Sequence, residues 1–132
     1  MTPLATEIYK LLVRRLRAGK SSMTYIELAQ QISTKMPTHQ RSPKLHAALG
    51  EISVACRAGN LPCVPAIVWR QDTRRPGAAY FRYAHPRTRS ESGRRVAWEV
   101  EHARVLAGVS KLPTTLRNSN HPKRGRADRS AS

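Results

Sequence analysis

Apolar residues at the start of the chain recur with the spacing of a helix. From Leu4 to Leu16 they are separated mainly by three or four positions, which places them on one stripe of an amphipathic helix. Thr2 and Pro3 are a capping hydroxyl followed by proline at the first helical position, and Gly19 follows the last apolar residue. The sequence therefore predicts a first helix that packs through this stripe.

Two further helices are predicted in the next forty residues. Thr24 and Glu27 have the spacing of a capping box, so a short helix is expected to begin there and to end near Ser33. A third helix is predicted over 42–59, where a Ser-Pro start precedes apolar residues at helical spacing and a glycine follows them. The polar connection 36–41 is longer than the turn of the tightest helix-turn-helix motifs.

After the third helix the pattern changes to two short apolar runs. Val64–Trp69 and Ala78–Tyr83 are predicted as paired strands, because they flank a polar loop. Pro76-Gly77 has the residue preference of a type II turn. The loop is too long for a two-residue hairpin, so we expect it to project, with Arg74 and Arg75 near its tip.

A fourth helix is predicted over roughly 96–109. One apolar face of it would contain Val96, Val100, Ala103 and Ala107. Trp98 and Leu106 widen the apolar surface, so this helix is expected to complete the core or to form a homodimer.

The remaining residues are almost free of apolar side chains. Residues 113–132 are therefore predicted to form a disordered basic tail, since they bury too little surface to offset chain entropy. The predicted fold class is a small α+β domain over residues 1–112. It consists of three helices, a two-stranded β-wing and an additional C-terminal helix, and the tail follows it.

Charge adds a partner class to this picture. The 132 residues contain 24 lysines and arginines and 8 acidic residues, which gives a formal net charge of +16. Such a balance predicts attraction to phosphate-bearing partners, although phosphate neutralisation carries no base sequence information. Arginine outnumbers lysine after residue 70, which suits bidentate phosphate contacts. Alternatively, a coding sequence that favours arginine would give the same composition in a protein that binds no nucleic acid.

Several other classes are disfavoured. The chain shows no secretory signal and no apolar segment of membrane-spanning length, so a cytoplasmic location is predicted, with nucleoid association if the protein binds DNA. Cys56 and Cys63 are expected to be reduced thiols, with Cys56 in the core. The five histidines lack metal-ligand spacing, and neither a phosphate-binding glycine loop nor a nucleophile elbow is present. We therefore predict a non-enzymatic protein without metal or cofactor.

The order of capped helix, Ser-Pro-capped helix and ribbon resembles the winged helix-turn-helix superfamily over about residues 4–83. The segments 56–62 and 76–77, together with Trp98-Glu99, also look like small uncharacterised proteins of phages and other bacterial mobile elements. The superfamily resemblance implies that the third helix enters a DNA major groove by its N-terminal end, while the wing contacts phosphate or a minor groove. The nucleic-acid-binding residues expected on this basis are Gln40, Arg41, Ser42, Lys44, His46, Arg74, Arg75, Lys123, Arg124 and Arg126.

Two functions follow from these observations. The first is non-enzymatic binding of nucleic acid, most simply double-stranded DNA, in a regulatory or accessory role. The second is a protein-interaction module of the mobile-element type, which binds or inhibits a host or phage protein. The outward face of the third helix favours this alternative, because beyond Lys44 it is small and nearly neutral, as at Ala47 and Glu51.

Overall fold

The computed structural model describes residues 1–116, which fold into five α-helices, two 3-10 helices and one small parallel sheet. This confirms the prediction of a small α+β domain. The α-helices are α1 (Pro3–Arg17), α2 (Tyr25–Ile32), α3 (Pro43–Ala58), α4 (Ala78–Ala84) and α5 (Glu91–Ala107). The strands are β1 (Met23–Thr24) and β2 (Val68–Trp69), and the 3-10 helices are η1 (Val64–Ile67) and η2 (Val109–Lys111).

Local capping sets the starts of the first three helices, as the sequence predicts. The Thr2 hydroxyl accepts a hydrogen bond from the third residue of α1, and the Ser42 hydroxyl accepts one from Lys44 N–H at 3.2 Å. At α2, the Thr24 hydroxyl accepts from Glu27 N–H at 3.1 Å, while the Glu27 carboxylate accepts from Thr24 N–H at 2.9 Å. The predicted capping box is therefore present, and it satisfies two donors that the helix leaves unpaired.

The predicted two-stranded wing is wrong. Within residues 1–116, β2 pairs in parallel with β1, and the run Ala78–Tyr83 is helical rather than extended. Gly77 has φ −79°, so the positive φ of a type II turn is absent there; Arg74 takes a positive φ of 57° instead. A short apolar run fits a buried helix as well as a strand. Here α4 buries Tyr80 and Phe81, which a helix of this length can place against α3.

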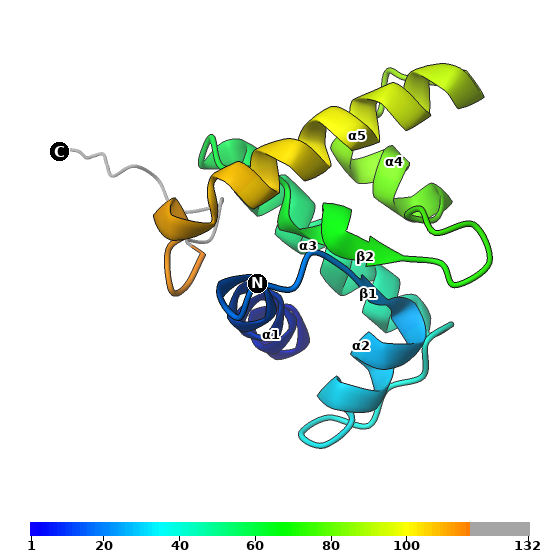
Figure 1. Ribbon diagram of the computed structural model, residues 1–132. Helices are drawn as coiled ribbons and strands as arrows, with labels where there is room; N and C mark the ends of the chain where they lie inside the picture. The colour runs from blue at the N-terminus through cyan, green and yellow to red at the C-terminus, as the bar shows by residue number, and fades with distance from the viewer. Residues whose placement is uncertain (117–132) are drawn as a thin grey trace, which may run out of the picture.

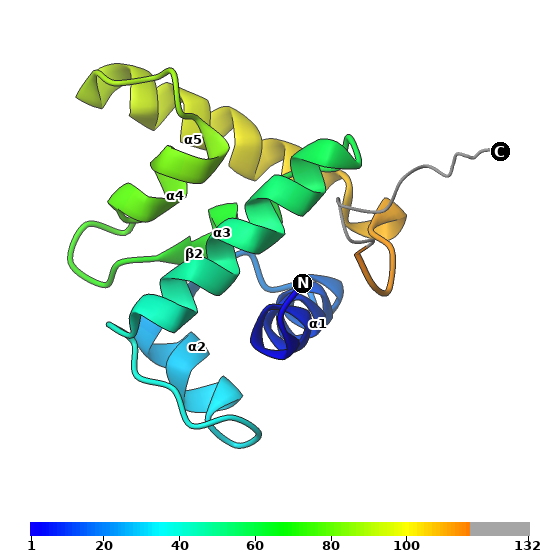
Figure 2. The same ribbon diagram turned by 180° about the vertical axis from the view of Figure 1, so that it is seen from behind.

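The central helix of the fold is α3. It lies between α1 on one side and α4 on the other, and η1 also packs against it (Figures 1 and 2). The segment from Val64 to Val68, which forms η1 and the start of β2, is buried. It lies between β1 and α2 on one side and α5 on the other. The core is accordingly aliphatic, with side chains such as Ile8, Leu28 and Ile52 fully buried.

Helix α5 begins earlier than predicted, because Ser90 caps it, and it presents a different face to the core. Its buried residues are Trp98, Glu101 and Val105. Trp98 Nε1 donates a hydrogen bond to the Ala66 carbonyl at 2.9 Å, which fixes the helix against η1. The predicted apolar face, which begins with Val96, is exposed instead. The indole ring of Trp98 removes more apolar surface from water than any single valine or alanine of that face would.

Candidate nucleic-acid interface

Arginine is concentrated in one continuous part of the chain, residues 70–95, here called the arginine segment. It contains eight arginines, two acidic residues and no lysine, so its formal charge is +6. The segment comprises the loop 70–77, α4, the loop 85–90 and the first turns of α5. These parts lie together at one side of the molecule, on the right in Figure 1 and on the left in Figure 2. An ion pair of 2.7 Å between Arg75 and Glu91 joins the first loop to α5.

The loop 70–77 is held in shape by its own hydrogen bonds. The Arg70 guanidinium donates to both oxygens of Asp72 at 3.0 and 2.8 Å, and the Arg74 amide donates to the Arg70 carbonyl at 2.9 Å. The hydrogen bond from Arg70 lowers the pKa of the Asp72 carboxyl below its ordinary value. At the end of the loop, Gly77 N–H donates to the Tyr25 hydroxyl at 3.0 Å. The loop is thus tied to the start of α2.

Four guanidinium groups of the segment are exposed and have no hydrogen-bond or ion-pair partner within residues 1–116; they belong to Arg74, Arg82, Arg87 and Arg89. A fifth, Arg94, has a structural role: it lies 5.4 Å over the centre of the Phe81 ring and donates to a backbone carbonyl of the loop before α5. The exposed four therefore project from a backbone that is fixed by neighbouring contacts. Guanidinium groups in this state can each donate two parallel hydrogen bonds to a phosphate.

The residues predicted at the start of the third helix meet the arginine segment across a groove of about 540 Å³. Gln40, Arg41 and His46 lie on one side of it, and Arg70 and Asp72 lie on the other. The His46 ring packs at 5.2 Å from the ring of a tyrosine in α2, and its Nε2 lies 3.1 Å from the Gln40 carbonyl oxygen. The structure therefore brings together three predicted residues with two that the prediction omitted, Arg70 and Asp72.

The other predicted residues are placed differently. Ser42 caps α3, so its hydroxyl is already hydrogen-bonded, and Lys44 is exposed on the first turn. Arg74 and Arg75 occupy the polar loop as predicted, although this loop leads into α4 and Arg75 pairs with Glu91. The tail candidates lie outside the described residues; they are Lys123, Arg124 and Arg126.

Helix α3 offers little surface for insertion into a DNA groove. Half of its 16 residues are buried, and α1 and α4 pack on opposite sides of it. At Gly50 the Tyr83 ring of α4 lies so close that an added Cβ would be 2.5 Å from a ring carbon. In the first turn of α3, His46 lines the groove and Lys44 is exposed to solvent.

Sequence reasoning missed Arg82, Arg87 and Arg89. Their signal is present in the sequence as arginine density, since Arg82 to Arg95 contains five arginines in fourteen positions. The density could be found without a structure. Their common location could not, because it depends on α4 being a helix that turns the chain back beside the loop 70–77.

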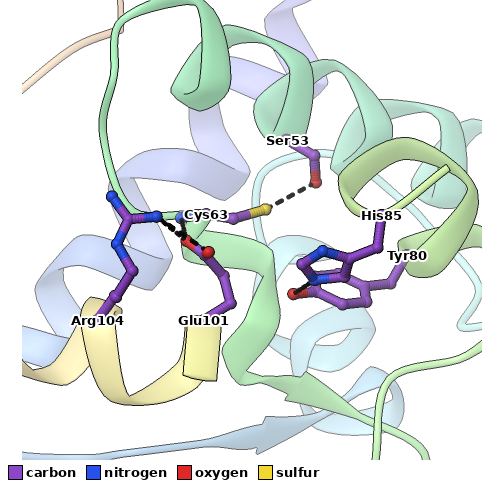
Figure 3. A network of polar contacts seen from close by, with 6 residues as sticks. All are labelled: Ser53, Cys63, Tyr80, His85, Glu101 and Arg104. Carbon is purple, nitrogen blue, oxygen red and sulfur yellow. Dashed lines mark hydrogen bonds and ion pairs between the residues drawn. The ribbon is translucent and has the colours of Figure 1, made fainter. Parts of the chain in front are cut away.

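A second polar cluster lies inside the fold, between α3, η1, α4 and α5 (Figure 3). Glu101 accepts hydrogen bonds from Cys63 N–H at 2.6 Å and from the Arg104 guanidinium at 3.0 and 3.1 Å. The Cys63 thiol donates to Ser53 at 3.3 Å, and burial raises its pKa to about 12. Burial also raises the pKa of the Cys56 thiol, to about 11, so both thiols stay protonated and are poor nucleophiles.

Comparisons with family descriptions, with curated proteins and with solved structures gave no match for this chain. The resemblance to the winged helix-turn-helix superfamily therefore stays a prediction from the sequence. Among residues 1–116, no group of three or more histidine, cysteine or acidic side chains is arranged to share a metal ion. In the same residues, every helix is too short or too polar to cross a membrane.

Proposed function

We propose that this protein binds nucleic acid without reacting with it, and that the arginine segment makes most of the contacts. The observation that carries the proposal is the set of exposed arginines, Arg74, Arg82, Arg87 and Arg89, which belong to loops and a helix that lie together at one side of the molecule (Figure 1). Arginines that hold the fold pair with acids or carbonyls, as Arg75 does with Glu91. The four named above have no such partner in the described residues, so phosphate is the ligand that best suits them.

The expected mode is contact with the nucleic-acid backbone rather than with base edges. Readout in a major groove needs a helix or ribbon that can enter it, whereas half of the residues of α3 are buried and both α1 and α4 pack against it. The groove between Arg41 and Arg70 has room for one strand of a sugar-phosphate backbone, with Gln40 and His46 as additional donors or acceptors. Double-stranded DNA is the proposed ligand, bound with limited sequence preference.

Binding of the full chain to duplex DNA, single-stranded DNA and duplex RNA over a series of salt concentrations tests this proposal. The double variant Arg74→Gln/Arg89→Gln is expected to weaken duplex binding. It should also reduce the slope of the log association constant against log salt concentration by about 1.8, since each lost phosphate contact contributes about 0.9. The matched control is Arg14→Gln with Lys20→Gln, which removes the same charge from exposed positions in and just after α1. Equal losses for both pairs would mean that total charge, not the arginine segment, attracts the DNA.

The groove is tested separately. Arg41→Ala should weaken binding while the melting temperature stays unchanged, because its side chain is exposed and has no partner in residues 1–116. Replacement of Lys123, Arg124 and Arg126 by glutamine is expected to lower affinity for all three nucleic acids alike. Loss of all binding in this tail variant, with none lost in Arg41→Ala, would assign binding to the tail instead.

A protein-interaction module is the second candidate, and one observation favours it. Helix α5 exposes large apolar side chains, including Val96 at 58% and Val100 at 57% exposure. Exposed apolar surface of this kind is characteristic of protein-binding sites. The partner that binds this face of α5 is therefore either a second copy of the chain or a different protein.

A further inference from the structure

One face of α5 is apolar and has no neighbour in the described structure. Val96, Val100, Ala103 and Ala107 follow one another at spacings of four, three and four residues, so they share one side of the helix. This side does not pack on the core: the four residues are exposed, and Leu106, at 41% exposure, flanks them. Of the large apolar residues that are exposed within residues 1–116, three belong to α5 and one, Val54, belongs to α3.

The core contacts of α5 are made by its opposite side. Trp98 and Val105 are buried there, and the indole N–H of Trp98 is hydrogen-bonded to η1. In both ribbon views α5 lies at the outer edge of the fold, with α4 and β2 to its inner side (Figures 1 and 2). The face with Val96 and Val100 is therefore accessible to a large partner without any change in the fold.

We infer that this face binds a second copy of the chain, with the two α5 helices packed antiparallel around a two-fold axis. In this arrangement Val96 of each copy lies opposite Val100 of the other, at the centre of the contact. Ala103 lies next along the same side of the helix, and its small size allows close approach of the two helices. Isologous contacts of this type are the commonest way in which soluble chains form closed oligomers.

Charge supports the second copy as the occupant. Arg95 and Glu99 border the apolar face on the same flank, and in an antiparallel pair equivalent flanks face one another. The register that pairs Val96 with Val100 also brings Arg95 of one copy to within about 3 Å, along the helix axis, of the level of Glu99 of the other. Two intermolecular ion pairs thus form by symmetry, one at each end of the valine contact.

The Arg95–Glu99 pair is able to change partners. Within one chain its Nε–Oε2 distance is 3.9 Å, and the two side chains are 64% and 58% exposed. Such a loose pair holds neither side chain in place, so both can reach across to a second helix. In a parallel pair, by contrast, the two basic N-terminal ends of α5 would lie together, and the helix dipoles would be aligned unfavourably.

The chain itself supplies no better cover for this face. Beyond the described residues, the only apolar side chains in 117–132 are Pro122, Ala127 and Ala131. A segment of that composition buries little apolar area against valine and leucine, and its five basic residues against one aspartate repel Arg95. A second α5 provides both the apolar surface and the carboxylate.

The oligomeric state of the full chain, measured by sedimentation at moderate salt, tests the inference. Salt of about 0.15 M or more limits repulsion between copies of charge +16, since the screening length is then about 8 Å or less. We expect a mass twice the 14.8 kDa of the chain, and monomers for Val96→Glu and for Val100→Glu with unchanged circular dichroism. Val54→Glu is the matched control, because it places the same charge on an exposed valine of α3, and it should remain dimeric. A monomeric wild-type chain, or a dimer that survives both α5 substitutions, would overturn the inference.

A charge exchange tests the antiparallel register. Arg95→Glu and Glu99→Arg should each weaken self-association about tenfold, since like charges then meet at both ends of the contact. Mixing the two variants should restore a heterodimer of near wild-type affinity, because every intermolecular pair is again complementary while each helix keeps its own internal like-charge pair. If the mixture stays monomeric, the proposed register is wrong. These measurements need no nucleic acid, so their failure is distinct from failure of DNA binding.

Discussion

Replacing Glu101 should destabilise the protein far more than replacing any other glutamate of α5. Its side chain is only 12% exposed, and it accepts the Cys63 amide hydrogen bond at 2.6 Å as well as two contacts from Arg104. Glu101→Ala leaves the buried Cys63 N–H without its acceptor, and such an unpaired donor costs about 1–3 kcal/mol. Glu101→Gln keeps a carbonyl oxygen at the same place and loses mainly the attraction of the half-exposed Arg104. We expect losses of about 2 kcal/mol for alanine and at most about 1 kcal/mol for glutamine.

Urea unfolding followed by circular dichroism measures these losses, provided that the slope of the free energy against urea is unchanged. The alanine variant should also melt about 8 °C lower, at about 4 °C per kcal/mol for a domain of this size. Glu91→Ala is the matched control, since Glu91 lies on the same helix with a side chain 74% exposed, and loss of its surface ion pair with Arg75 should cost less than about 1 kcal/mol. Equal stability of the alanine and glutamine variants would refute the role assigned to the Cys63 hydrogen bond.

Three further predictions concern tyrosines. Tyr25→Phe removes the acceptor for Gly77 N–H, so it should cost about 1 kcal/mol in urea unfolding and increase protease cleavage in the loop 70–77. Gly50→Ala forces a Cβ to 2.5 Å from the Tyr83 ring. The overpacking cost exceeds the gain in helix propensity, so this variant should be about 1 kcal/mol less stable. In a Tyr83→Ala background, where the clash is absent, Gly50→Ala should stabilise the protein instead. Burial raises the pKa of Tyr9 from 10.0 to about 12. The stability that the neutral phenol contributes is therefore fully present below pH 10 and is lost as the pH rises toward 12. Unfolding at several pH values and absorbance at 295 nm measure this loss.

Specific results would contradict each of these. Unchanged protease sensitivity in Tyr25→Phe would mean that other contacts hold the loop. A Gly50→Ala penalty that persists after Tyr83→Ala would place the strain elsewhere. Tyr9 donates its hydroxyl hydrogen to the Pro113 carbonyl at 2.6 Å, and Tyr9→Phe should abolish the part of the alkaline stability loss that this phenol causes. An alkaline profile identical in wild type and Tyr9→Phe would exclude Tyr9 as its source.

The starts of α1, α2 and α3 were predictable because the atoms that determine them are close in sequence. Thr24 and Glu27 satisfy each other's backbone groups across three residues, and no distant part of the chain changes that exchange. The same local logic predicts the Ser42 cap. The high positive charge and the arginine density after residue 70 are likewise properties of the sequence alone.

The region after α3 was not predictable from its own residues. The run 64–69 is apolar throughout, so it carries no periodicity that separates strand from helix, and the run 78–83 is too short to do so. Their conformation follows from what they pack against: β1 gives two residues of β2 a parallel partner, while α3 accepts Tyr83 of α4 over Gly50. The predicted wing failed because these contacts lie far apart in the sequence.

The sequence by itself determined where the early helices begin, that the chain is strongly basic, and that α5 has more apolar positions than one face requires. Only the tertiary structure decided which of those positions enter the core. Trp98 and Val105 are buried, and Val96 and Val100 stay exposed, because the fold has one contact surface for α5 and the indole fills it with a hydrogen bond to Ala66. Tertiary contacts also gathered the arginines on one side, since α4 reverses the chain between Arg75 and Glu91 and lets them pair. Local hydrogen bonds are encoded locally, whereas competition for buried area is settled by the whole chain.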